Sequence, residues 1–524
     1  MTLPRFLDRV HDAAGPLLGG MASGELGDRL ATTSVVLEMT DDVASLPGQR
    51  AGYLFAANLA ARLYPRLGFQ APSDLADEAV ALARAINPHC LLGPPRGHTL
   101  TVSWNGGEPA ADRVTVAIDG WNISIDGVSA STARAVPAAA LAGAALAIGE
   151  LFRARFAPEL EHGRTQPARF ALNLVTLGDH ADIPPLPDAI ELGTVHLAGC
   201  GAVGQAAVAA LRELPVTGTL VAVDHDPLDL GNLQRYVLSF DADVGQEKPA
   251  LVARALEHHP LTVEPVFSPW GADERSAPGR DTVLAALDTK QGRIELQSGL
   301  PREIFNAWTQ PEDVGVSRHQ AFGVDPCLAC LGWPKGVRPS DSELIAEALG
   351  EHELRVVLYL SEGTPVGAPL PPHVIAPTGR LPLPGDAGTW ARRSLLDDVI
   401  ERREIAPEEL RPFADLGIRQ LYSDVVCAGV LLEHEGRDRH TEVSVPLAHQ
   451  SAIAGVLLAT WLVIDRVPEL RALRPEAPQA RYDALRGGAQ RWTRDRGRQP
   501  GCICSDEDFL AAYAARWPSA TAPA

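Results

Sequence analysis

Three closely spaced glycines open a stretch of the sequence, residues 193–248, whose residue types suit phosphate chemistry. Gly199, Gly201 and Gly204 form a G-x-G-x-x-G turn directly after the short apolar run 195–198. Glycines at this spacing let backbone N–H groups approach a phosphate, and the helix expected next adds the positive end of its dipole. The stretch therefore predicts a nucleotide site, but this motif alone does not say which nucleotide.

Two carboxylates follow the next apolar run, residues 219–223. Asp224 stands 20 positions after Gly204, a spacing at which an acidic side chain can hold a ribose hydroxyl, and Asp226 completes D-x-D. Both would lie at the end of a parallel strand, where open α/β sheets bind their ligands.

An amide and two basic side chains come shortly afterwards. Asn232, Arg235 and Lys248 lie within the sequences N-L-Q-R-Y and D-V-G-x-x-K. A hydride-transfer enzyme does not need these groups behind the ribose carboxylate, whereas an enzyme that stabilises negative charge at an α-phosphate does. Each residue alone is more often a surface residue, so their joint spacing carries the interpretation.

This combination resembles the E1-like adenylating enzymes of the ThiF and MoeB superfamily, which activate ubiquitin-like proteins. Their pattern is a glycine loop, D-x-D, N-L-x-R-Q and D-V-G-x-x-K; residues 190–335 match it clearly, with a departure at Tyr236, where Gln is usual. The resemblance implies ATP as cofactor, with Asp224 on the ribose and Asp226 near the phosphates. The residues that it places around ATP are Gly199, Gly201, Gly204, Asp224, Asp226, Asn232, Arg235 and Lys248.

A further carboxylate, Asp288, ends the apolar run 282–287 in the sequence LDTKQGR. In the resembled family the corresponding Asp coordinates the Mg²⁺ that bridges the ATP phosphates, and Mg²⁺ commonly takes one or two carboxylates from protein. The alternatives are a helix N-cap for Asp288 and a solvated helix charge for Arg293.

Four of the seven cysteines form two close pairs, Cys327 with Cys330 and Cys502 with Cys504. A C-x-x-C followed distantly by a second pair is typical of four thiolates around a structural Zn²⁺. Members of the resembled family often carry such a site, although the second pair here is C-x-C. Four unrelated thiols are the alternative. The expected role is folding, because the metal would tie the C-terminal segment to the active lobe.

Cys427 is the only cysteine between these pairs. In the resembled enzymes a thiol in this region attacks the acyl-adenylate and carries the activated protein as a thioester. Apolar neighbours such as Val425 and Val426 favour a small buried side chain instead, and the sequence shows no electropositive setting for a reactive thiol. Cys90 and Cys200 are expected in the core.

The order of elements predicts an α/β protein with four regions. Residues 191–335 are expected to form a doubly wound Rossmann-like adenylation core, since strands and helices alternate there. Residues 1–190 are interpreted as a degenerate adenylation-like lobe or as an unrelated substrate-recognition domain. Residues 336–440 are expected to form an inserted crossover segment, and residues 441–524 a closing helix with a polar, zinc-tethered tail.

Hydrophobic periodicity predicts the individual elements. Two Ala-rich helices, 137–156 and 446–466, echo each other in sequence. Ala-rich buried helices are common, so the repeated lobe is what the resemblance implies, since the resembled family is built from paired lobes. Further helices are expected over 50–66, 75–86, 206–214, 252–256, 391–404 and 407–419. Strands are expected over 35–38, 100–104, 114–118, 121–125, 195–198, 219–223, 262–267, 282–287 and 303–308.

Composition excludes some classes of protein. A chain of 524 residues with 46% hydrophobic and 21% charged residues suits a globular protein of two or more domains. The net charge of −20 argues against nucleic-acid and anionic-membrane partners. No stretch is expected to reach the length of a membrane span and the N-terminus lacks a signal-peptide core, so the expected location is the cytoplasm.

These features, with the resemblance, imply an ATP-dependent adenylating enzyme that acts on the C-terminal carboxylate of a ubiquitin-like protein or peptide, similar to the E1-like enzymes of bacterial ubiquitin-like conjugation systems. The residues predicted to be catalytic are Arg235, Lys248, Asp288 and Cys427, with Mg²⁺ and structural Zn²⁺ as metals. An E2-like thiol acceptor and a homodimer are left open. The alternatives are peptide adenylation or nucleotidyl transfer without a thioester, a noncatalytic peptide-presenting adaptor, and an NAD-dependent oxidoreductase.

Overall fold

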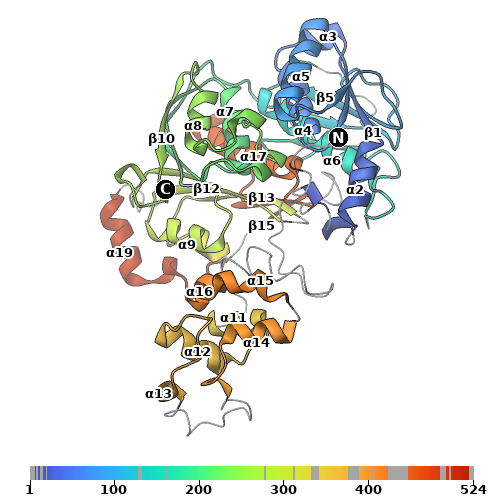
Figure 1. The fold of residues 1–524 in the computed structure, drawn as a ribbon. Helices are drawn as coiled ribbons and strands as arrows, with labels where there is room; N and C mark the ends of the chain where they lie inside the picture. Colours follow the sequence, from blue (N-terminus) through green and yellow to red (C-terminus); the bar gives the residue numbers. More distant parts are fainter. Residues whose placement is uncertain are drawn as a thin grey trace. The chain divides into compact units, whose positions relative to one another are not determined.

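The computed structural model of the chain divides into two compact units, residues 1–333 with 444–524, and residues 334–443 (Figure 1). It describes residues 6, 10–11, 14, 16–18 and 21–518, apart from 128–132, 161, 277–278, 311–312, 332–340, 376–388, 404, 423–445, 484–490 and 495–496.

The first unit is built on two sheets. The strands of the N-terminal sheet are β1 (Thr33–Glu38), β2 (Arg66–Gln70), β3 (Leu91–Leu92), β4 (His98–Ser103), β5 (Arg113–Asp119), β6 (Asn122–Ile125) and β7 (Phe170–Asn173). Those of the second sheet are β8 (Ile190–Ala198), β9 (Val216–Asp224), β10 (Leu261–Phe267), β11 (Thr282–Ala285), β12 (Glu303–Thr309), β13 (Asp313–His319), β14 (Gln479–Asp483) and β15 (Arg491–Arg494).

The two sheets have the same topology. The strand orders are β3-β2-β1-β4-β5-β6-β7 and β10-β9-β8-β11-β12-β13-β14-β15. In each sheet the first five strands in this order are parallel and the remaining strands are antiparallel. The structure thus confirms the mixed α/β class, and the N-terminal lobe repeats the strand order of the second sheet.

The long helices also occupy equivalent positions. Helix α4 (Gln49–Ala61) lies between β1 and β2 as α7 (Ala202–Arg212) lies between β8 and β9, and the Ala-rich helices α6 (Pro137–Arg155) and α17 (Ala448–Arg466) each follow the first antiparallel strand. α6 packs on α4, α17 packs on α7, and α6 and α17 pack on each other. The sequence echo between the two Ala-rich helices therefore lies at matching positions, in the core that joins the two sheets.

These two Ala-rich helices correct one expectation. Both have 19 residues and are apolar enough to cross a membrane by length and composition, so the expectation that no stretch reaches that length is wrong. However, 83% and 100% of their apolar windows are buried inside the protein. They are apolar all round because other helices and the strands of the sheets pack around them, as in the core of a large domain.

The remaining helices of the first unit are α2 (Ser23–Ala31), α3 (Asp41–Ala44), α5 (Ser73–Ile86), α8 (Lys248–Ala255), α9 (Lys290–Ser298), α10 (Leu328–Leu331), α18 (Pro468–Arg471) and α19 (Glu507–Arg516). Short 3-10 helices are η1 (Pro16–Leu18), η2 (Leu230–Gln234), η3 (Asp241–Asp243), η4 (Glu274–Ser276) and η10 (Ile503–Ser505). The helix expected over 50–66 ends at Ala61, because the chain returns to the sheet as β2.

The segment after α17 is more than the polar tail that was expected. It adds β14 and β15 to the second sheet, with Ala480 and Tyr482 of β14 buried. The expectation missed them because the strands are short and charged, and the pairing of β14 with β13 is made across more than 150 residues of sequence.

The second unit is helical in its described part. Its helices are α11 (Asp341–Leu349), α12 (Glu353–Glu362), α13 (Pro372–Ile375), α14 (Leu395–Arg403), α15 (Pro407–Leu410), η7 (Arg411–Phe413) and α16 (Ile418–Leu421). A small apolar core holds them together, and buried Arg355 pairs with Asp398. The single helix expected over 407–419 is broken, since Pro412 and Gly417 lie between α15 and α16.

Candidate active site

The glycine loop joins the end of β8 to the start of α7. Gly199 has φ +97°, and a Cβ there would lie 2.7 Å from the carbonyl oxygen of Ala286. A Cβ on Gly204 would lie 2.1 Å from the carbonyl oxygen of Gly199. Side chains at both positions would collide with backbone, so the loop can pass this close to the residues after β11 only with glycines there.

Asp224, at the end of β9, braces this loop. Its Oδ2 accepts a hydrogen bond from the Cys200 amide at 2.8 Å, and its Oδ1 accepts one from the Asp226 amide at 2.9 Å. Each carboxylate oxygen has a further lone pair, so Asp224 can still accept a ribose hydroxyl. One side chain thus joins the glycine loop to the D-x-D turn.

Lys248, the first residue of α8, reaches the same carboxylates. Its Nζ lies 3.1 Å from Oδ2 of Asp226 and 3.9 Å from Oδ1 of Asp224. The Lys248 side chain is 6% exposed and that of Asp226 is 55% exposed. Burial lowers the pKa of Lys248, but Tyr236, Asp224 and Asp226 together outweigh burial and raise the pKa above its usual value. The ammonium therefore stays charged in a mostly enclosed position.

The segment after η2 supplies the next groups. The Asn232 side chain accepts from the Asp229 amide at 3.1 Å and so caps η2. The guanidinium carbon of Arg235 lies 5.5 Å from the ring centroid of Tyr236, and Nζ of Lys248 lies 5.6 Å from the same centroid. Both cations thus contact one aromatic ring.

Tyr236 is the residue at which the sequence departs from the family pattern. Its side chain is buried, and burial raises the pKa of its hydroxyl. The hydroxyl oxygen lies 3.2 Å from the position that a Cβ on Gly201 would occupy. Tyr236 therefore packs against the glycine loop, in a place where a larger residue at position 201 would crowd it.

Asp288 lies beyond the end of β11 and is exposed. It is not the N-cap of α9, because that place belongs to Thr289, whose Oγ1 accepts from the Gly292 amide at 3.0 Å. The Asp288 carboxylate is thus not used as a helix cap.

Arg293 is a structural residue of this strand end. It donates to the carbonyl oxygens of Leu287 at 2.6 Å and Ala307 at 3.3 Å, and so joins the ends of β11 and β12. Burial lowers the pKa of Arg293 to about 10, while Asp288 acts in the opposite direction. The interpretation of Arg293 as a solvated helix charge is therefore wrong.

Oxygen and nitrogen donors gather at the D-x-D turn. Asp224, His225 and Asp226 each place one donor atom within 4.8 Å of the others. Asp288 does not belong to this group of three. Exposed carboxylate oxygens are the ligands that Mg²⁺ prefers, so Asp226 and Asp288 have suitable chemistry for it.

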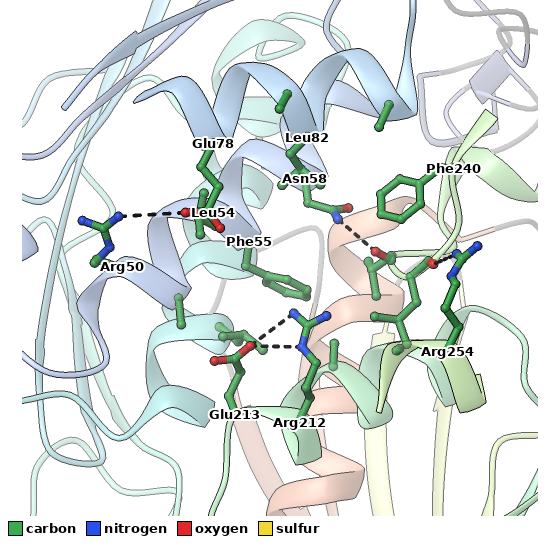
Figure 2. Close-up of a pocket in the computed structure, with 18 residues that line it drawn as sticks. Arg50, Leu54, Phe55, Asn58, Glu78, Leu82, Arg212, Glu213, Phe240 and Arg254 are labelled. Atoms are coloured by element: carbon green, nitrogen blue, oxygen red, sulfur yellow. Dashed lines mark hydrogen bonds and ion pairs between the residues drawn. The ribbon is translucent and has the colours of Figure 1, made fainter. Parts of the chain in front are cut away.

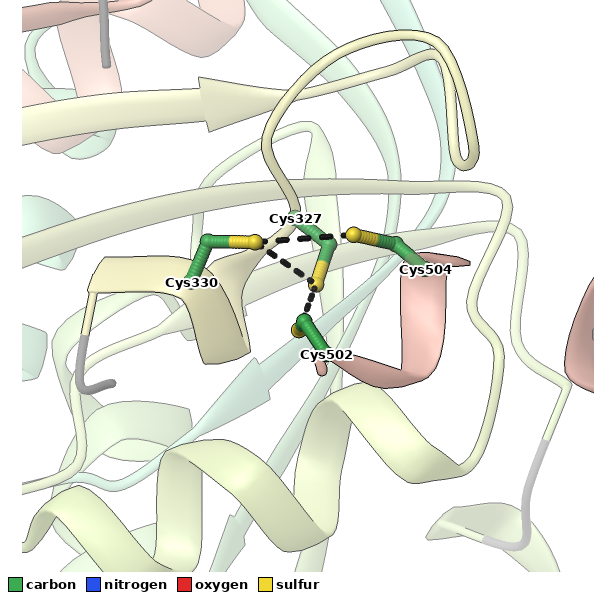
Figure 3. A group of neighbouring side chains, drawn as sticks. All are labelled: Cys327, Cys330, Cys502 and Cys504. Atoms are coloured by element: carbon green, nitrogen blue, oxygen red, sulfur yellow. Dashed lines mark hydrogen bonds between the residues drawn. The ribbon is translucent and has the colours of Figure 1, made fainter. Parts of the chain in front are cut away.

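Four cysteine sulfurs meet at a second place (Figure 3). Sγ of Cys327 lies 3.9 Å from that of Cys330 and 3.5 Å from that of Cys502, and Sγ of Cys330 lies 3.5 Å from that of Cys504. All four are buried. Zn–S bonds of about 2.3 Å in a tetrahedron place the sulfurs about 3.8 Å apart. The cluster therefore fits a structural zinc ion that would tie η10 to α10.

The other cysteines divide between the core and the part of the chain that is not described. Cys200 is buried and Cys90 is half-buried, and burial raises the pKa of both thiols. Neither thiol is therefore activated as a nucleophile. Cys427 lies outside the described residues.

Gln205 of α7 is a further member of the site that was not predicted from the sequence. It is buried, donates to the Ser239 hydroxyl at 2.9 Å and accepts from the Leu238 amide at 3.0 Å. Gln205 thus joins helix α7, which follows the glycine loop, to residues 238 and 239, which come shortly after Arg235. The signal was a single amide side chain among the otherwise apolar residues 202–211.

Comparison with known proteins agrees with this geometry. Residues 185–298 match the ThiF family model. The glycine loop, the D-x-D carboxylates and Lys248 therefore lie in a domain of the ThiF family, which identifies the chain as an ATP-dependent adenylating enzyme. Over its whole length it belongs to one family with uncharacterized protein y4jF of Sinorhizobium fredii, to which it is 30% identical over 545 residues, covering 100% of this chain and 99% of y4jF.

Solved structures with a similar fold include E. coli MccB in complex with N-formylated MccA, at 11% identity and a TM-score of 0.35, covering 76% of this chain and 99% of MccB. E. coli MccB with ATP matches at 12% identity and a TM-score of 0.35, covering 76% of this chain and 98% of that one. PaaA matches at 13% identity and a TM-score of 0.30, covering 58% of this chain and 72% of PaaA.

Proposed function

We propose that the enzyme adenylates the C-terminal carboxylate of a peptide or protein. One observation carries the proposal: the charged, enclosed Lys248 ammonium lies beside Asp224 and Asp226, next to the glycine loop. A cation held in this position can stabilise negative charge at an α-phosphate, which an NAD-dependent hydride transfer would not require.

The reaction follows from the groups present. A carboxylate oxygen of the substrate attacks the α-phosphorus of ATP, the bond from this phosphorus to the oxygen bridging to the β-phosphate breaks, and pyrophosphate leaves. Because nucleophile and phosphate are both anionic, catalysis consists mainly of positioning and charge neutralisation. Lys248 and Arg235 supply the positive charge, and the loop amides and Asp224 hold the nucleotide.

The Mg²⁺ that accompanies ATP would be held by Asp288 and Asp226. Both carboxylates are exposed, and Asp288 is not used as a helix cap. The metal would neutralise charge on the β- and γ-phosphates. The chain's own contribution is to place two carboxylates at the ends of β9 and β11.

The N-terminal lobe is proposed to be a degenerate adenylation lobe. Its strand order and the positions of α4 and α6 match those of the active lobe, which supports this origin over an unrelated domain. Its connection from β1 to α4, residues 39–48, contains one glycine, Gly48, in place of G-x-G-x-x-G, so the lobe keeps the packing without the three-glycine phosphate loop. The regional boundaries expected from the sequence, 1–190, 191–335, 336–440 and 441–524, are kept as the proposed division.

The finer proposal concerns the substrate. A ubiquitin-like protein is proposed as the acyl substrate, with transfer to Cys427 and then to an E2-like thiol. The motif resemblance supports this, together with the position of Cys427 between the two cysteine pairs. A cytoplasmic location and a homodimer accompany the proposal. The alternatives are peptide adenylation without a thioester and a noncatalytic adaptor; the charged Lys248 site favours an enzyme over the adaptor.

Exchange of labelled pyrophosphate into ATP tests the function. Purified protein with ATP and Mg²⁺ is expected to catalyse exchange when a substrate with a free C-terminal carboxylate is present, and not with the same substrate carrying a C-terminal amide. Panels of short peptides and of ubiquitin-like proteins separate the two substrate classes. Equal exchange with the amide, or calorimetry that detects NAD binding and no ATP binding, would contradict the proposal.

A further inference from the structure

Arg62, at the C-terminal end of α4, extends from the N-terminal lobe into the active lobe. Its Nη1 donates to the carbonyl oxygen of Leu233, and its Nη2 donates to that of Ser239 at 3.1 Å. Its Nε donates to Oδ1 of Asn58 at 2.8 Å. The side chain is fully buried. One guanidinium therefore holds both ends of the segment 233–239.

Burial of this charge is unusual because, among the residues that the structure describes, Arg62 forms no ion pair. Burial alone lowers the pKa of Arg62 to about 9. A buried charge without a counter-ion is costly unless its donors are satisfied. Here two backbone carbonyl oxygens and one side-chain amide oxygen accept hydrogen bonds from the guanidinium. The buried charge is therefore stabilised only while segment 233–239 keeps this conformation.

The segment has Arg235 and Tyr236 between its two anchored ends. Asn58 of α4 also donates to the carbonyl oxygen of Val237 at 2.9 Å (Figure 2). Two side chains of the N-terminal lobe thus hold three carbonyl groups that lie on either side of Arg235.

Apolar packing is incomplete on one side of this segment. A cavity of about 710 Å³ lies between α4, α5, α7 and α8 (Figure 2), and Val237, Leu238 and Phe240 line part of it. Side chains that border an open cavity make fewer packing contacts on that side. The hydrogen bonds from Asn58 and Arg62 therefore restrain the segment from the N-terminal lobe, in addition to those that Gln205 and Arg254 make from the active lobe.

We propose that Arg62 is a positioning residue for adenylation: from the N-terminal lobe it fixes the segment that presents Arg235 to the α-phosphate of ATP. The inference rests on the proposed function, since it gives the otherwise degenerate lobe a part in that reaction. Arg62 is fully buried, so the role proposed for it is to position Arg235 and not to contact nucleotide or substrate. A planar guanidinium spans two carbonyls, whereas the single ammonium of lysine cannot hold both in the same way.

The test compares Arg62→Lys with Arg164→Lys in the full-length protein. Arg164 is a matched control because it is also fully buried and binds backbone carbonyls, but its contacts with Asp126, Ala110 and Arg113 lie within the N-terminal lobe. Hydrogen–deuterium exchange without nucleotide measures the order of residues 233–239 directly. Arg62→Lys is expected to speed exchange there at least tenfold, and Arg164→Lys is not.

Kinetics provide the second measurement. With a substrate that supports pyrophosphate exchange, Arg62→Lys is expected to lower kcat about 100-fold, since a displacement of about 1 Å can have that effect. The KM for ATP should change less than threefold, because the glycine loop and Asp224 still hold the nucleotide. A purely structural role would instead give the two variants similar losses of folded protein and unchanged kcat per folded molecule.

The outcomes separate this inference from the proposed function. If no substrate supports exchange in the wild type, the proposed function fails, while faster deuterium exchange confined to Arg62→Lys still supports the anchoring. Two results overturn the inference: hydrogen–deuterium exchange of residues 233–239 that is unchanged in Arg62→Lys, or an unchanged kcat in the folded variant. If that variant does not fold, Asn58→Ala replaces it, with a smaller effect expected in the same direction because only the Val237 contact and the support of Arg62 are lost.

Discussion

Nζ of Lys248 lies 3.1 Å from Oδ2 of Asp226, and this pair joins the start of α8 to the turn after β9. The two partners differ in burial: the lysine is enclosed, and the carboxylate is largely exposed. The cation is therefore fixed in place, whereas Asp226 can change partner when nucleotide arrives. Such a pair keeps the ammonium charged before ATP binds and leaves it available to a phosphate afterwards.

The first prediction concerns this ammonium. Lys248→Met should lower pyrophosphate exchange about 100-fold or more, because the variant loses a preorganised charge at the reacting phosphate. Lys248→Arg should not restore activity, since the larger planar guanidinium does not fit the enclosed position. Lys290→Met is the matched control, because Lys290 also begins a helix but is exposed. Normal exchange in Lys248→Met would remove Lys248 from the catalytic site.

The second prediction concerns Mg²⁺. Asp288→Asn should lower exchange about 100-fold at 1 mM Mg²⁺ and recover part of it at higher Mg²⁺, since a carboxylate ligand is lost. The thermal midpoint should change little, because Thr289 rather than Asp288 caps α9. Asp281→Asn, at the other end of β11, is the control. A Mg²⁺ titration that is the same for Asp288→Asn and the wild type would contradict the assignment.

The nucleotide motif was predictable from the sequence because its residues lie in one β-α-β unit. Gly199, Asp224 and Lys248 are brought together by two neighbouring strands and the helix after them, so their spacing along the chain translates directly into proximity. The same locality explains why most strands of the second sheet were predicted.

Contacts between distant segments could not be predicted in this way. The anchoring of Leu233 and Ser239 by Arg62 joins residues more than 170 positions apart, and no local pattern marks Arg62. The N-cap of α9 is Thr289 and not its neighbour Asp288. The spacing of residues along the sequence does not distinguish between two adjacent cap positions. The pairing of β14 with β13 likewise depends on where the chain returns after its helical insertion.

The third prediction concerns the cysteine cluster. Purified protein should contain one zinc ion per chain, and Cys502→Ser should lose it and destabilise the first unit by about 4 kcal/mol. Deuterium exchange should rise in residues 497–518, since the metal would fix η10. Cys90→Ser is the control, because Cys90 is half-buried and far from the cluster in sequence. Metal analysis without zinc in protein prepared free of chelators would reject the site.

The fourth prediction concerns pH. Burial raises the pKa of Asp243, but hydrogen bonds from Arg254 and the Phe240 amide outweigh burial and hold the pKa below its usual 3.8. Because the folded pKa is lowered, this stabilisation is complete above about pH 4 and is lost as the pH falls through the folded pKa. Asp243→Asn should therefore cost about 1 kcal/mol at pH 7.

The difference in stability between wild type and Asp243→Asn should stay constant from pH 7 to pH 5 and shrink below pH 4. Thermal unfolding at each pH measures it, with Asp281→Asn as an exposed control. A difference that is as large at pH 3 as at pH 7 would show that the charge of Asp243 is not responsible.

The last prediction concerns Cys427. If its thiolate attacks the acyl carbon of the acyl-adenylate, the carbon–oxygen bond to the phosphate breaks, AMP leaves, and the thiol proton goes to solvent. Cys427→Ala should then catalyse pyrophosphate exchange at the wild-type rate, because adenylation needs only the nucleotide site and the substrate carboxylate. It should fail to form the adduct that dithiothreitol releases on a non-reducing gel.

Cys90→Ala should still form that adduct, as its thiol is not activated. An adduct that persists in Cys427→Ala assigns the nucleophile to another residue, and exchange without an adduct in the wild type favours a peptide-adenylating enzyme that releases its acyl-adenylate.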